Sequence, residues 1–171
     1  TVLADMAARD VQYWCYPHKS CGENDHTPVR GARMTYGYGF WRSGFVALIP
    51  WIYSYTRSDP MNYLTGTTMD FLVRHEPDGT PIPVALWEAF REGHDDYNYI
   101  YTLEQLIAEA RASGNADAIA AADEAQRELD YVWDRINVLP RYQYDGLWPA
   151  GDFDAYRWLI AEQIMKVQEA M

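Results

Sequence analysis

Basic side chains are scarce in this chain, and no hydrophobic run is long. Fourteen lysines and arginines stand against 25 aspartates and glutamates, so the formal net charge at pH 7 is −11. Binding to nucleic acid or to an anionic membrane requires a basic patch. The most apolar run, residues 45–55, is far too short to span a bilayer and contains Pro50. We therefore expect neither nucleic acid nor a membrane as a partner.

Cysteine is also rare, since Cys15 and Cys21 are the only two in the chain. A disulfide between them and two free thiols are both compatible with the sequence, and neither identifies the compartment. With His18 and His26 they offer four zinc ligands, but the spacing C-x2-H-x2-C-x4-H fits no common zinc module. The chain also lacks a P-loop, a G-x-G-x-x-G after a strand and a G-x-S-x-G elbow. We predict no metal site and no cofactor.

Two kinds of aromatic residue are abundant instead: the chain has 14 tyrosines and 7 tryptophans. Their side chains have flat apolar faces and a polar edge, which suits them to stack on sugars or to close an interface. The alternative is that these rings fill an aromatic core.

The order of elements suggests a β/α protein. The continuous apolar run over 45–53 is expected to be a strand buried on both faces. With a β-rich segment over 11–16 and a helix over 30–43, it reads as a βαβ unit with parallel strands. A further strand over 69–75 precedes a turn at Pro77-Asp78-Gly79. Helical periodicity then predicts three helices, at 84–113, at 117–138 and from Asp152 onward.

Two or three parallel strands need neighbours to close a sheet. We therefore predict an α/β fold in which residues 1–82 are the last two or three strands of a (β/α)8 TIM-type barrel. Residues 83–171 would form an α-helical C-terminal segment packed on that barrel, and the rest of the barrel would lie upstream of Thr1. The alternative is a small α/β domain that folds alone.

In a β/α barrel, the functional face lies at the carboxyl ends of the strands. Aromatic and polar side chains gather at these positions, and a carbohydrate is the ligand class that they suit. The predicted substrate-binding residues are Trp14, Tyr16, His18, Trp51, Tyr53 and Glu76.

The helix over 84–113 carries a dense charge cluster. Glu88, Arg91 and Asp95 are spaced to pair on one helical face, whereas glycoside hydrolysis needs two carboxyl groups placed across the scissile bond. A glycine inside a helix costs roughly 1 kcal/mol relative to alanine, so a neighbour should pack closely against Gly93. We predict no catalytic residue here and assign a structural role to Arg91, Glu92, Gly93, Asp96 and Tyr97.

The motifs appear in a recognisable order: VQYWCYP, then G-F-x-x-L-x-x-W-x-Y, a D-P loop, D-F-L-V, and finally R-E-G-x-x-D-Y. Over residues 11–106 this order resembles the C-terminal portion of glycoside hydrolase family 123, the β-N-acetylgalactosaminidase-like proteins. The resemblance implies a (β/α)8 domain that acts on glycans. It also implies that an adjacent Asp-Glu pair, working with the N-acetyl group of the substrate, lies upstream of Thr1. Because relatives that degrade polysaccharides are often exported, the resemblance favours an extracellular or periplasmic location.

Three functional hypotheses follow. The leading one is a fragment of a glycoside-hydrolase-like protein that supplies aromatic sugar-binding residues and is inactive without its upstream acid/base pair. The second is a non-catalytic carbohydrate-binding or structural module. The third is an interaction domain that uses the helical C-terminal half.

Overall fold

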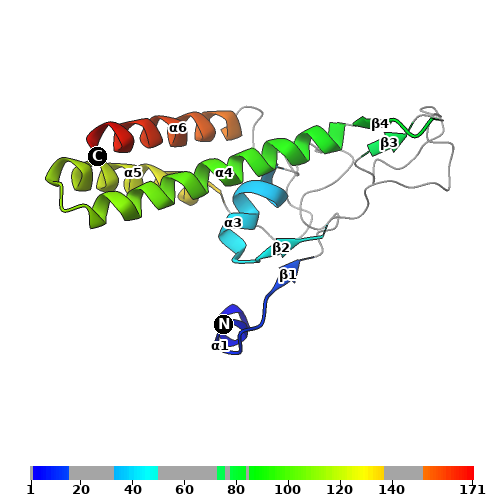
Figure 1. Cartoon of the computed structure of the whole chain (residues 1–171), viewed down its shortest axis with the longest axis horizontal. Helices are drawn as coiled ribbons and strands as arrows, with labels where there is room; N and C mark the ends of the chain where they lie inside the picture. Colours follow the sequence, from blue (N-terminus) through cyan, green and yellow to red (C-terminus); the bar gives the residue numbers. More distant parts are fainter. Residues whose placement is uncertain (1, 16–32, 50–72, 76–77, 84, 137–151) are drawn as a thin grey trace. The chain divides into compact units, whose positions relative to one another are not determined.

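The computed structural model describes residues 2–15, 33–49, 73–75, 78–83, 85–136 and 152–171. The chain divides into two compact units, residues 1–94 and 95–171. The first unit holds short elements (Figure 1): α1 Val2–Ala8, β1 Trp14–Cys15, the π-helix η2 Met34–Tyr38, α3 Gly39–Ser43, β2 Ala47–Leu48, β3 Val73–His75 and β4 Pro81–Pro83. Three long helices follow: α4 Ala85–Ala112, which begins in the first unit, α5 Ala116–Arg135 and α6 Asp152–Ala170.

The predicted fold, the last strands of a TIM-type barrel, is wrong. Helix dominates the described residues, whose strands are only two or three residues long and form two separate two-stranded sheets. The apolar run over 45–53 was expected to be a strand buried on both faces. Its strand β2 covers two residues, and Val46 and Ile49 on either side are 59% and 47% exposed. A continuous apolar run alone therefore does not identify a buried barrel strand.

The third predicted barrel strand belongs to a hairpin. β3 pairs antiparallel with β4, with Arg74 opposite Ile82. The chain reverses because the Asp78 carboxylate accepts a hydrogen bond from the Thr80 backbone N–H at 2.9 Å, and Gly79 adopts a positive φ of 87°. A turn signal was visible in the sequence, but a strand made of Pro81-Ile82-Pro83 was not.

One local prediction holds in the first unit, since β1 and β2 pair in parallel, with Trp14 opposite Ala47. Between them, η2 continues into α3 at Gly39, whose N–H donates to the Met34 carbonyl. A Cβ at Gly39 would lie 2.6 Å from that oxygen, so glycine is needed for this wide helical turn. Gly44, with a φ of 72°, ends α3 in the left-handed conformation.

Aromatic rings form the small core of the first unit. Tyr36 of η2 meets Phe90 of α4 edge-on at 4.7 Å between ring centroids, and Phe90 stacks on Trp87 at 5.6 Å. Ala89 and Leu48 pack in the same cluster. Aromatic contacts therefore hold the start of α4, where packing on a barrel was predicted.

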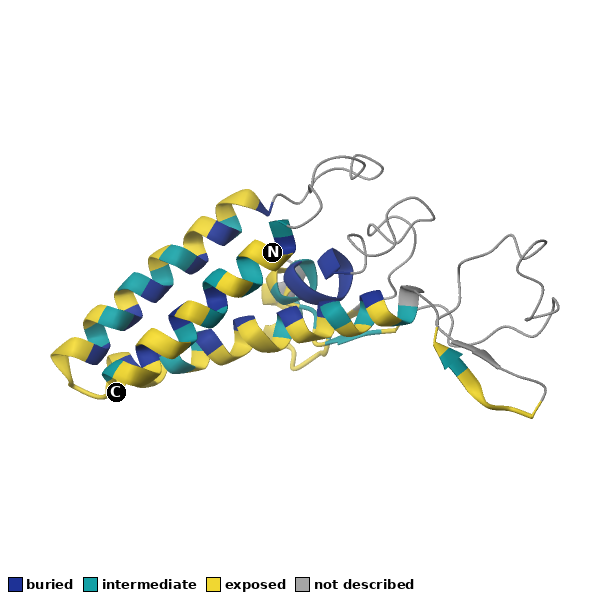
Figure 2. Ribbon diagram, turned by 90° about the horizontal axis from the view of Figure 1, so that it is seen from above, coloured by how far each residue is buried: buried dark blue, intermediate teal, exposed yellow. Residues whose placement is uncertain are grey.

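The second unit is built from α5, α6 and the part of α4 after His94. Buried residues recur along each helix, as the dark blue bands in Figure 2 show. α5 contributes small residues to this core, at the three- and four-residue spacing of a helix-packing face. The buried apolar side chains are Ile100, Leu103, Ile107, Ala110, Ala118, Ala122, Ala125, Leu129, Val132, Ile136, Phe153, Ile160 and Val167.

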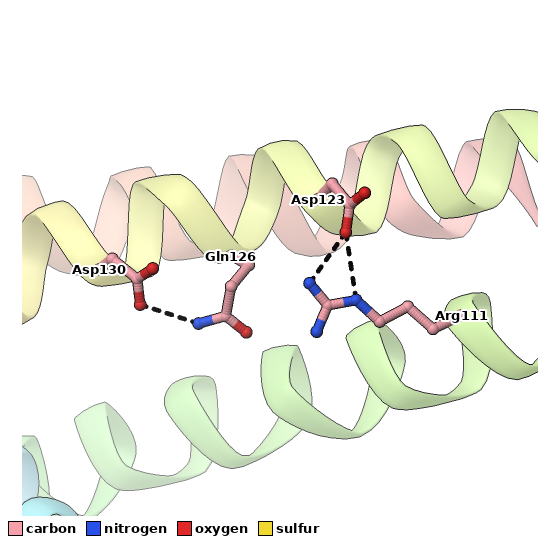
Figure 3. Close-up of polar contacts among 4 residues, drawn as sticks. All are labelled: Arg111, Asp123, Gln126 and Asp130. Carbon is pink, nitrogen blue, oxygen red and sulfur yellow. Dashed lines mark hydrogen bonds and ion pairs between the residues drawn. The ribbon is translucent and has the colours of Figure 1, made fainter.

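Polar contacts between the helices set the directions in which the three helices run. Two nitrogens of Arg111 in α4 donate to Asp123 of α5 at 2.9 and 3.2 Å, as drawn in Figure 3. Asn115 caps the start of α5, and its side-chain nitrogen donates to the Ala170 carbonyl at the end of α6. Lys166 of α6 also binds Glu124 of α5 at 2.7 Å. α6 therefore runs parallel to α4 and antiparallel to α5.

Candidate functional site

Of the six predicted substrate-binding residues, only Trp14 lies in the part of the chain that the structure describes. Tyr16, His18, Trp51, Tyr53 and Glu76 fall outside it. The Trp14 side chain is 56% exposed on β1, and its indole N–H donates to the side-chain oxygen of Gln12 at 3.2 Å. It is an accessible ring, and it does not lie at the mouth of a barrel.

The predicted structural residues all lie on α4. Arg91 pairs with Glu88 one turn away on the exposed side of the helix. Gly93 is buried, and Glu92 and Tyr97 are half-buried.

The buried pair between Asp96 and Arg157 organises the second unit. Asp96 is completely buried and accepts a hydrogen bond from Nε of Arg157 in α6, 61 residues away, at 2.7 Å. Removing a carboxylate from water is costly unless the charge is paired and hydrogen-bonded. The pair therefore joins α4 to α6 and sets which side of α6 faces α4 near Arg157.

Arg157 of this pair also lines a groove, which we call the aromatic groove. It is lined by Tyr99, Arg157, Trp158 and Ala161 and has a volume of about 200 Å³. The guanidinium carbon of Arg157 is 5.9 Å from the centroid of the Tyr99 ring, which is within cation–π range. Trp158 is 69% exposed, the most exposed large hydrophobic side chain among the described residues. The small side chain of Ala161 leaves room between the two helices.

Arg157 is the charged residue among the four that line the groove. The Arg157 charge is matched by the buried carboxylate beneath it. None of the four lining residues is a histidine, a cysteine or a carboxylic acid. The arrangement can therefore stack a ligand on two aromatic faces, but it presents no pair of groups for acid–base chemistry.

A second aromatic cluster lies where α5 ends and α6 begins. The Arg135 guanidinium lies 3.6 Å from the Tyr131 ring centroid. Burial, and then the Asp152 carboxylate, raise the pKa of the Tyr156 hydroxyl above its ordinary value. Tyr156 also meets Phe153 edge-on, with 6.4 Å between the ring centroids.

No group of three or more His, Cys, Asp or Glu side chains among the described residues is placed to hold a metal ion. Four residues were considered as a zinc site, and the side chain of Cys15 and all of His18, Cys21 and His26 lie outside the described part. In the described part, none of the helices has both the length and the apolar character needed to cross a bilayer.

Sequence reasoning missed the aromatic groove. Helical spacing gives the last helix an inward face of Phe153, Tyr156, Leu159, Ile160, Ile164 and Val167, and Trp158 falls outside that set. A large aromatic on the polar side of an amphipathic helix was the available signal. No signal in the sequence linked Arg157 to Asp96, because their contact is tertiary.

No protein-family model, curated protein or solved structure matches this chain. The resemblance to glycoside hydrolase family 123 stays a prediction from the sequence.

Proposed function

We propose that the chain is a non-catalytic binding module, and that its helical unit holds a ligand in the aromatic groove. The observation that carries this proposal is the pairing of a widely exposed Trp158 with Tyr99 beside an arginine fixed by Asp96. An exposed tryptophan costs solubility, and an aromatic side chain has few rotatable bonds, so it binds with little loss of conformational freedom. Binding rather than catalysis is supported by the lining residues, which offer aromatic faces and no acid–base pair.

The test follows the indole N–H signal of Trp158 in a ¹H–¹⁵N spectrum, identified by its loss in Trp158→Ala. The full chain is titrated with oligosaccharides containing N-acetylhexosamine and with short acidic, basic and neutral peptides. We expect at least one ligand class to shift this signal in a saturable way and to lose affinity in Trp158→Ala. If no class shifts the signal while the helical unit is folded, or if the chain hydrolyses an aryl glycoside in a Trp158-dependent manner, the proposal is wrong.

A second candidate function comes from the sequence, namely sugar binding by the aromatic residues of the first unit as part of a glycoside-hydrolase-like protein. One observation favours it: the Trp14 indole is exposed and is held by Gln12. Glycan binding would then be lost in Trp14→Ala and kept in Trp158→Ala, which is the reverse of the pattern expected for the aromatic groove. Equal affinity of both variants for N-acetylgalactosamine oligosaccharides would contradict this candidate.

A further inference from the structure

The negative charge of the chain is concentrated in the second unit. Residues 95–171 contain 15 acidic and 6 basic side chains, for a net charge of −9, whereas residues 1–94 contain 10 and 8, for a net charge of −2. A surface of one sign attracts partners of the opposite sign and raises their rate of association. The unit that carries the aromatic groove is therefore the part of the chain suited to a cationic partner.

Three carboxylates, which we call the rim carboxylates, lie one helical turn along the chain from the aromatic residues of the groove. Asp95 lies one helical turn before Tyr99, and Asp154 and Glu162 lie one turn before and after Trp158. All three are exposed, and Glu162 also acts on Lys166 by raising its pKa, after the larger effect of the Glu124 hydrogen bond. The lining cation is matched by Asp96, and residues 95–171 carry a net charge of −9, so a cation that approaches the groove meets a negatively charged unit.

The size of the groove favours one side chain over a whole small molecule. Its volume of about 200 Å³ is below the roughly 300–1,000 Å³ typical of pockets that enclose drug-sized ligands. Two aromatic faces beside carboxylates are the surroundings that stabilise an ammonium or guanidinium group. Arginine suits the site better than lysine, because its planar guanidinium stacks on aromatic faces and is more weakly hydrated.

We infer that the aromatic groove accepts an arginine or lysine side chain from a basic segment of a partner protein. The cation lies against the Trp158 and Tyr99 rings, and the three rim carboxylates attract the remaining positive charges of the segment. This inference rests on the proposed binding function of the groove and names the partner that occupies it.

The experiment measures the affinity of the full chain for a fluorescein-labelled peptide of glycine, serine and arginine by fluorescence anisotropy. A peptide with citrulline at each arginine position keeps the shape and removes the charge. Trp158→Ala tests the ring, and Glu162→Gln tests the rim. Glu109→Gln is the matched control, because Glu109 is an exposed carboxylate of the same unit, more than two turns along α4 from Tyr99. Circular dichroism checks that each variant keeps its helix content.

We expect Trp158→Ala to weaken the affinity about two- to thirtyfold, the range of exposed to desolvated cation–π contacts. Glu162→Gln should weaken it by about fivefold or less, as for a surface ion pair, and Glu109→Gln should change it less than Glu162→Gln does. The affinity should also fall with added salt. Equal binding of the citrulline peptide, or an unchanged affinity in Trp158→Ala, overturns the inference but leaves the groove as a binding site for another ligand class. If no ligand class shifts the Trp158 indole signal, the proposed function fails as well.

Discussion

Removal of the Arg157 side chain should destabilise the helical unit more than removal of an arginine from its surface. Without Arg157, the completely buried carboxylate of Asp96 loses the Nε donor that lies 2.7 Å from its oxygen. Breaking a buried ion pair by deleting one partner costs about 3–5 kcal/mol, because the remaining charge is uncompensated. The Arg157 side chain is 21% exposed, so water reaches part of the site after truncation. We therefore expect Arg157→Ala to lower the free energy of unfolding by about 3 kcal/mol.

Urea unfolding followed by far-UV circular dichroism measures this loss, and amide exchange in α6 assigns it to the helical unit. Arg111→Ala is the control, since Arg111 and Asp123 are about half exposed and such surface pairs contribute about 0–1 kcal/mol. Adding Asp96→Asn to Arg157→Ala removes the buried carboxylate that lost this donor and should restore part of the stability. If Arg157→Ala costs no more than Arg111→Ala, the assignment of a buried, organising ion pair is refuted.

Three further predictions concern the core, the π-helix and the response to pH. Gln163→Met should raise the free energy of unfolding by about 1 kcal/mol, because the buried side-chain oxygen of Gln163 has no hydrogen-bond partner among the described residues; a loss of stability would contradict this. Gly39→Ala should cost about 1–3 kcal/mol in urea unfolding, since its Cβ would lie 2.6 Å from the Met34 carbonyl oxygen; unchanged stability would mean that the wide turn is not formed. The Lys166 hydrogen bond, and then the charge of Lys166, lower the pKa of Glu124, so the stabilisation it gives is present above its unfolded pKa and is lost as the pH falls through its folded pKa. Glu124→Gln should therefore flatten the acid limb of a stability–pH curve, and an unchanged limb would count against this ion pair.

The three long helices could be predicted because local information specifies them. Expected helices at 84–113 and 117–138 correspond to α4 and α5, and the last helix begins at Asp152 as predicted. Gly114, with a φ of 73°, and Asn115, whose side chain accepts hydrogen bonds from two backbone N–H groups, end one helix and start the next. Helical periodicity and helix caps each depend on residues that are close together in the sequence, so both can be recognised from the sequence alone.

The strands could not be predicted equally well, because their partners are distant in the sequence. The apolar residues around β2 read as a buried strand, yet Val46 and Ile49 are exposed. β3 was expected to be a parallel strand, but the turn at Asp78 and Gly79 gives it the antiparallel partner β4. Strand type depends on which segment pairs with which, and single-strand patterns do not specify this.

At the candidate site, too, the local contacts could be predicted from the sequence and the tertiary contacts could not. Charge spacing on α4 predicted that Glu88, Arg91 and Asp95 pair on one face, and the structure confirms the pair of Arg91 with Glu88. It did not reveal that Asp96 is buried against Arg157, because that contact joins two helices 61 residues apart. The exposed Trp158 was overlooked because the periodic face of α6 already contained enough apolar residues to explain the helix.

Whether the aromatic groove is a ligand site is tested most directly by nuclear magnetic resonance. The measurement records intermolecular nuclear Overhauser effects from a bound ligand to assigned aromatic rings. We expect effects from ligand protons to the rings of both Tyr99 and Trp158, and the loss of those to the Tyr99 ring in Trp158→Ala. Effects confined to rings outside the groove, such as Trp14, would contradict it.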